Sequence, residues 1–103
     1  MIRVTVMYPQ TEGARFDMDY YVNKHVPLVG DLCGAAMKSA TIDAGLAGMT
    51  PGDPPPYVAM VHMTFESVEA FQGAFGPNIP QIMGDVPNYT DIAPQVQISE
   101  VKE

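Results

Sequence analysis

Residues 57–65 read Tyr57-Val58-Ala59-Met60-Val61-His62-Met63-Thr64-Phe65, the most regular alternating stretch of the chain. Its aromatic and β-branched side chains predict a strand, because such side chains pack well on a pleated surface. Successive side chains of a strand point to opposite faces, and here both faces are mainly apolar. A sheet built around residues 57–65 therefore needs cover on both sides.

The other elements follow from apolar periodicity and from capping and turn residues. They are a strand at 2–8, a helix at 18–33 that Asp17 caps and Gly34 ends, a strand at 37–44, a loop at 45–56, a helix from Val68 that Ser67 caps and Pro77 stops, a short helical turn at 79–83, a loop at 84–90 and a strand at 94–101. The order β-α-β-β-α-β predicts an α+β fold, a ferredoxin-like four-stranded antiparallel sheet with two helices on one face.

Two helices cover only one face of such a sheet. The other face would be apolar along residues 57–65 and partly along 2–8, and soluble monomers rarely expose an apolar patch of that size. Face-to-face pairing of two sheets in a symmetric homodimer would cover it. Alternation alone leaves open which set of side chains from residues 57–65 meets the partner.

Composition limits the class of protein. With 103 residues, the chain is expected to form one domain over 1–103, and 47% hydrophobic against 17% charged residues indicates a packed globule. A net charge of −7 disfavours nucleic acid and anionic membrane surfaces, since both are bound through Lys and Arg clusters. No apolar run approaches the ~18 to 20 residues that span a bilayer. Cys33 has no second cysteine to pair with, and the first residues lack signal-peptide features, so we expect a cytoplasmic protein.

His25 is the most informative polar residue, because it falls on the apolar face of the helix expected at 18–33. At about 100° per residue, Tyr21 and Val29 share that face. Partial burial would lower the pKa of the imidazole and keep it neutral, which is the form that acts as a base. Pro27 removes a backbone hydrogen bond to Asn23, so the helix should kink or loosen beside His25. A core histidine satisfied by a carbonyl and a hydroxyl is the alternative.

Four more side chains are candidates for contact with a ligand: Tyr8, Tyr21, His62 and Tyr89. Packing is the alternative role for each of them. Asp85 and Asn88 are expected to stabilise their own turn through side-chain to backbone hydrogen bonds. The chain has no glycine-rich phosphate loop, no His-Glu-x-x-His, no paired cysteines and no Gly-x-Ser-x-Gly, so we expect neither a metal nor an organic cofactor.

Two segments resemble the paired signatures of the EthD family, named from ethyl tert-butyl ether degradation. The residues that carry the resemblance are Tyr8-Pro9, Gly13, Phe16-Asp17, Asp19-Tyr20-Tyr21, His25, Pro27-Leu28 and Asp85-Val86-Pro87-Asn88-Tyr89-Thr90. The resemblance implies the dimeric α+β barrel superfamily, with a ligand cavity between sheet and helices. Its members include cofactor-free monooxygenases, polyketide cyclases, lactone isomerases and haem-degrading enzymes, and EthD-like proteins are commonly grouped with oxidoreductases of xenobiotic breakdown.

Together these features predict a small homodimer that binds an apolar or aromatic organic molecule between sheet and helices. His25, at the position of the family's histidine, would transfer a proton without a cofactor. A non-catalytic binding or accessory protein for a hydrophobic metabolite is the alternative, and a purely structural dimer is a third reading. Because some relatives by fold bind haem through a helix histidine, haem on His25 is a further alternative.

Overall fold

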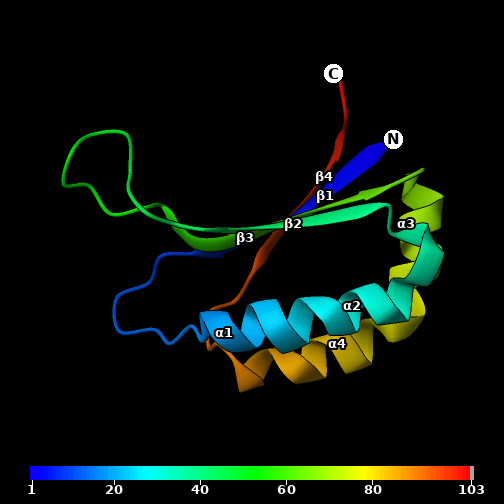
Figure 1. The fold of residues 1–103 in the computed structure, drawn as a ribbon, viewed down its shortest axis with the longest axis horizontal. Helices are drawn as coiled ribbons and strands as arrows, with labels where there is room; N and C mark the ends of the chain where they lie inside the picture. Colours follow the sequence, from blue (N-terminus) through cyan, green and yellow to red (C-terminus); the bar gives the residue numbers. More distant parts are fainter. Residues whose placement is uncertain (103) are drawn as a thin grey trace.

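The computed structural model describes residues 1–102 as one sheet with helices on one of its faces (Figure 1). The strands are β1 (Ile2–Pro9), β2 (Ser39–Ala44), β3 (Tyr57–Phe65) and β4 (Gln95–Glu100). The helical segments are α1 (Met18–Tyr20), η1 (Tyr21–His25), α2 (Val26–Cys33), η2 (Gly34–Ala36), α3 (Val68–Phe75), η3 (Gly76–Asn78), α4 (Ile79–Asp85) and η4 (Val86–Asn88). This order matches the predicted β-α-β-β-α-β pattern, with each helical region divided into short consecutive segments.

The four strands form one antiparallel sheet in the order β2-β3-β1-β4. β1 lies inside the sheet, where Val4 is opposite Met63 of β3 and Ile98 of β4. The first strand pairs with both the third and the fourth, which is the ferredoxin-like arrangement. The predicted fold class is therefore confirmed. β2 begins at Ser39 instead of residue 37, because the helical region before it extends through η2.

The first helical region runs without a break from α1 through η1 to α2. Asp17 caps it, since its carboxylate accepts a hydrogen bond from the Tyr20 amide at 3.1 Å. Gly34 ends it with a φ of 60°, a left-handed conformation that favours glycine. Both capping predictions are confirmed. Within residues 1–102, no helix is long and apolar enough to cross a membrane.

The middle of this region, η1, is a π-helix. The Val26 amide donates to the Tyr21 carbonyl, five residues earlier, just before Pro27 in the first turn of α2. The expected loosening beside His25 therefore takes the form of one wide turn, and such turns are frequent at functional sites. Val22, which lies in this wide turn, is 41% exposed.

The second helical region extends further than expected. The prediction of a loop over residues 84–90 was wrong, since α4 continues through Gly84 to Asp85 and η4 continues to Asn88. Pro87 lies in the first turn of η4, where a missing amide hydrogen is tolerated. Asp85 is consequently the last residue of α4, so the helix fixes the direction of its side chain.

The end of this region is joined to the segment before α1. The Asp17 amide donates to the Tyr89 carbonyl at 2.7 Å, and the Thr90 hydroxyl donates to the Arg15 carbonyl at 2.6 Å. Phe16 and Thr90 also form an isolated β-bridge. These contacts place the two segments that resemble EthD signatures side by side.

The structure settles which face of β3 meets the helices. Ala59, Val61, Met63 and Phe65 are buried beneath them. The opposite face, here called the outer face, is less apolar than expected, because neighbouring strands add hydroxyl, amide and charged groups. By strand register it carries Val58, Met60, His62 and Thr64 of β3 beside Arg3, Thr5, Met7, Ser39, Thr41, Asp43, Gln95, Gln97 and Ser99.

Candidate functional site

A cavity lies between the sheet and the helices. Its volume is about 100 Å³, and it is partly open to the surface. Aliphatic side chains from β1, β3, α2 and α4 form most of its wall, and Tyr8, Tyr21 and His25 are the polar side chains that the structure places in that wall. An apolar cavity of roughly 150 Å³ is known to hold benzene. At about 100 Å³ this cavity is smaller, so it takes only part of an aromatic molecule, with the rest reaching out through the opening.

The π-turn η1 places His25 in the cavity wall, where the residue is 5% exposed. Its Nδ1 lies 2.9 Å from Oδ2 of Asp85, a residue of α4. The imidazole stacks on the Tyr21 ring, with 5.7 Å between ring centroids, and packs against Tyr89 at 4.5 Å. Two aromatic rings and the Asp85 carboxylate therefore contact the imidazole.

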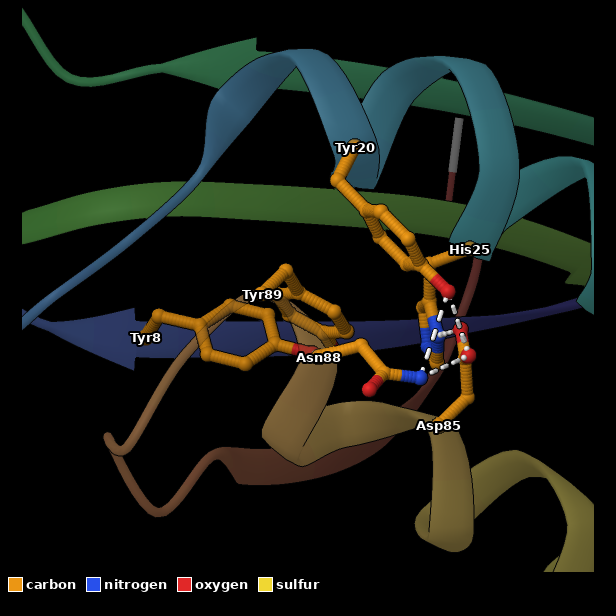
Figure 2. Close-up of polar contacts among 6 residues, drawn as sticks. All are labelled: Tyr8, Tyr20, His25, Asp85, Asn88 and Tyr89. Carbon is orange, nitrogen blue, oxygen red and sulfur yellow. Dashed lines mark hydrogen bonds and ion pairs between the residues drawn. The ribbon is translucent and has the colours of Figure 1, made fainter.

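Asp85 is itself held by two further donors (Figure 2). The Tyr20 hydroxyl donates to its Oδ1 at 2.7 Å, and the Asn88 side-chain amide donates to the same oxygen at 2.9 Å. The carboxylate thus accepts from three side chains of two helical regions, instead of only stabilising its own turn as the sequence led us to expect. Sequence analysis missed Asp85 as the partner of His25, and its place in the second EthD-like signature was the available signal.

The protonation states follow from burial and from this hydrogen bond. Burial lowers the pKa of His25 below its usual 6.5, although the hydrogen bond and the charge of Asp85 act in the opposite direction. For Asp85, burial acts to raise the pKa, but the hydrogen bonds from Tyr20, His25 and Asn88 outweigh it and hold the pKa below its usual 3.8. Near neutral pH the pair is thus an imidazole and a carboxylate, so Nδ1 carries the proton and Nε2 has a free lone pair.

Three buried tyrosines pack together beside the histidine, and two of them, Tyr21 and Tyr89, contact its ring. The hydroxyls of Tyr8 and Tyr89 lie 2.6 Å apart, and burial raises the pKa of each. The Tyr21 ring packs edge-on against Tyr8 and is tilted against Tyr89, with centroids 5.4 and 5.1 Å apart. The structure therefore brings Tyr8, Tyr21 and Tyr89 together with His25, and their contact with a ligand stays a prediction.

His62 lies elsewhere. It is on the outer face of the sheet, where its Nδ1 is 3.1 Å from the Thr5 hydroxyl and its Nε2 is 3.0 Å from Oδ2 of Asp43. Both ring nitrogens are thereby engaged on the side away from the helices. The structure does not bring His62 to the cavity that holds His25.

The described residues offer neither a metal-binding cluster nor a cavity of the size of haem. Among residues 1–102, no group of three or more His, Cys, Asp or Glu side chains is arranged to hold a metal ion. A cavity of about 100 Å³ is far smaller than a haem macrocycle. The cavity therefore does not fit haem.

Fold and site together define a small ferredoxin-like α+β protein with a histidine–aspartate pair in an apolar cavity. The chain belongs to the EthD family, since the model of the EthD domain matches residues 10–93. It is also 34% identical over 91 residues to an uncharacterized 11.0 kDa protein from the thcB-thcC intergenic region of Rhodococcus erythropolis, covering 86% of this chain and 84% of that protein.

Solved structures agree with this assignment. A crystal structure of an EthD-like protein from Ralstonia eutropha matches with a TM-score of 0.96 and 49% identity, over 99% of this chain and 92% of that one. An EthD family protein from Bacillus halodurans matches with a TM-score of 0.66 and 18% identity, over 98% of both chains. A protein from Arabidopsis thaliana matches with a TM-score of 0.70 and 13% identity, over 100% of this chain and 97% of that one. The last two comparisons support the fold alone.

Proposed function

We propose that the protein binds a small apolar or aromatic organic molecule between sheet and helices, and that His25 transfers a proton to and from it. The observation that carries this proposal is the contact of Nδ1 with Asp85 at 2.9 Å, in a histidine that lines an apolar cavity. This contact leaves Nε2 unprotonated on the side of the ring away from Asp85. A neutral imidazole so held is suited to act as a general base.

The chemistry needs only the residues of the chain. Nε2 of His25 removes a proton from an acidic C–H or O–H group of the bound molecule, and the negative charge of Asp85 stabilises the imidazolium that forms. The organic anion is then ready for isomerisation, cyclisation or reaction with oxygen, and His25 returns the proton where the reaction requires it. This chemistry corresponds to a cofactor-independent oxidoreductase, cyclase or isomerase of breakdown or secondary metabolism.

We place this activity in a cytoplasmic homodimer. The outer face of the sheet is the surface left for a second copy, because the helices already cover the other face. Val58 and Met60 of β3 and Met7 of β1 give that face an apolar part. Pairing of two outer faces would leave both cavities intact, since each cavity lies on the opposite side of its own sheet.

Proton exchange in heavy water tests the proposal. Phenylacetone, an uncharged aromatic ketone with acidic C–H groups, is incubated with the protein, and loss of its α-proton signals is followed by NMR. We expect the wild type to accelerate exchange and His25→Ala to lose the acceleration by a factor of about 10² to 10⁴. Asp85→Asn, which removes the charge beside His25, should also slow the exchange. Asp43→Asn is its matched control, because Asp43 also contacts a histidine but on the outer face. Binding of phenylacetone without any acceleration would favour a non-catalytic binding protein.

A further inference from the structure

The Tyr21 hydroxyl is buried without a partner. The residue is 1% exposed, and its Oη lies near the Tyr8 hydroxyl but has no hydrogen bond of good geometry within residues 1–102. Among the described residues, Tyr21 Oη is the one buried side-chain oxygen or nitrogen that lacks a hydrogen-bond partner. A buried hydroxyl that lacks a partner is unfavourable, because it has lost its hydrogen bonds to water without replacing them. Since Tyr21 also lines the cavity, a bound molecule is the natural partner for this group.

Neighbouring polar groups are already engaged. The Tyr8 hydroxyl pairs with that of Tyr89 at 2.6 Å, and Nδ1 of His25 pairs with Asp85. Burial, together with the nearby Tyr8 hydroxyl, raises the pKa of Tyr21 far above its usual 10.0, so the group remains a neutral phenol. Tyr21 therefore has an O–H group to donate, and the ligand must supply the acceptor.

The cavity wall also limits the charge of the ligand. No lysine or arginine is among the side chains that line it. A carboxylate or phosphate would enter an apolar wall with no opposite charge, which is strongly unfavourable. The adjacent Asp85 carboxylate and the net charge of −7 add further repulsion. An anionic ligand is thus disfavoured at this position.

The two free groups of the site are complementary to one kind of molecule. Tyr21 offers a hydrogen-bond donor, and Nε2 of His25 offers a proton acceptor. Both residues line the cavity, and their rings are stacked with an interplanar angle of 15°. A carbonyl group meets the first requirement with its oxygen and the second with the acidic hydrogen on the adjacent carbon.

We propose that the ligand is an uncharged carbonyl compound with an apolar body, whose oxygen accepts a hydrogen bond from Tyr21 while the carbon next to the carbonyl faces His25. This inference rests on the proposed function for the location of the site, and it adds the substrate class and the role of Tyr21 as the residue that selects it.

Three molecules of the same shape test the inference by binding alone. Acetophenone carries a carbonyl, α-methylstyrene replaces that oxygen by a methylene group, and benzoate carries a charge. Affinities are measured by NMR titration for the wild type and for Tyr21→Phe, which removes only the hydroxyl. Tyr57→Phe is the matched control, because the Tyr57 hydroxyl contacts Gln95 at 3.4 Å and Tyr57 is not part of the cavity wall.

We expect the wild type to bind acetophenone about tenfold more tightly than α-methylstyrene, and benzoate least tightly. Tyr21→Phe should abolish the preference for acetophenone, whereas Tyr57→Phe should keep it. Equal affinity for the first two molecules, a preference that survives Tyr21→Phe, tighter binding of benzoate, or no binding of any of the three would each overturn the inference. The readout is independent of proton exchange: a Tyr21-dependent preference without exchange would contradict only catalysis by His25.

Discussion

His25 and Asp85 lie 60 positions apart in the sequence, and the chain brings Nδ1 of one to within 2.9 Å of Oδ2 of the other. The wide turn η1 presents the histidine, and the last residue of α4 presents the carboxylate. This relationship determines which ring nitrogen carries the proton, and most of the predictions below follow from it.

Asp85→Asn tests the partner of the base. An asparagine oxygen still accepts a hydrogen bond from Nδ1, but it supplies no negative charge to stabilise the imidazolium. We expect a slower proton exchange of phenylacetone, with a loss smaller than the roughly 10²- to 10⁴-fold expected for removal of the base itself. The charge of Asp85 raises the pKa of His25, so the acid limb of the exchange rate should also move to lower pH. Asp43→Asn should show neither change, and equal effects of the two substitutions would contradict the assignment of Asp85.

His25→Ala and His25→Asn separate a catalytic role from a structural one. If His25 is the base, His25→Ala should fold and dimerise normally but lose exchange, and His25→Asn should retain ligand binding through its polar side chain. If His25 only satisfies the core, His25→Ala should lower stability by roughly 1 to 3 kcal/mol and leave activity largely intact. Thermal unfolding and ligand titration on both variants distinguish these outcomes.

Stability should fall on acidification in two stages. His25 has a folded pKa below 6.5, so below that pH the unfolded chain binds more protons than the folded one, and stability decreases. Asp85 has a folded pKa below 3.8, so its contribution is present above 3.8 and is lost as the pH falls through the lower folded value. Denaturant unfolding at about pH 7.5, 5.5, 4 and 3 measures this dependence. His25→Asn should flatten the first stage, and an unchanged slope in that variant would assign the effect to other groups.

The two faces of β3 should respond differently to a carboxylate. Val61→Asp places a charge in the cavity wall beneath the helices and should destabilise the fold by about 3 to 5 kcal/mol. Met60→Asp places it on the outer face, where the isolated domain should tolerate it but a dimer should not. Light scattering of the wild type should give about twice the chain mass of 11.2 kDa, and Met60→Asp should reduce it. A monomeric wild type at micromolar concentration would rule out the proposed dimer.

The order of elements was predictable because each strand and helix carries a local signal. The strand at residues 57–65, the Asp17 and Ser67 caps and the Gly34 stop all depend on residues close together in sequence, and all are present. The disturbance at Pro27 was predictable for the same reason, since a missing amide hydrogen always removes a backbone bond.

The parts of the site that the sequence did not predict depend on contacts between residues far apart in the chain. Asp85 had an adequate local role in its own turn, and nothing in the adjacent sequence indicates a histidine 60 positions earlier. The location of His62 was undecidable because both alternating sets of residues 57–65 are mainly apolar. Its contacts with Thr5 and Asp43 depend on the register of three strands, which only the assembled sheet provides.

The proposed chemistry requires His25 to be a neutral base with Nδ1 protonated toward Asp85 and Nε2 free. Nitrogen NMR of the imidazole ring, with His25→Asn used to assign its signals, measures this state directly. We predict a protonated Nδ1 and an unprotonated Nε2 at neutral pH, and a titration midpoint below 6.5. A proton on Nε2 at neutral pH, or a midpoint above 6.5, would contradict the account.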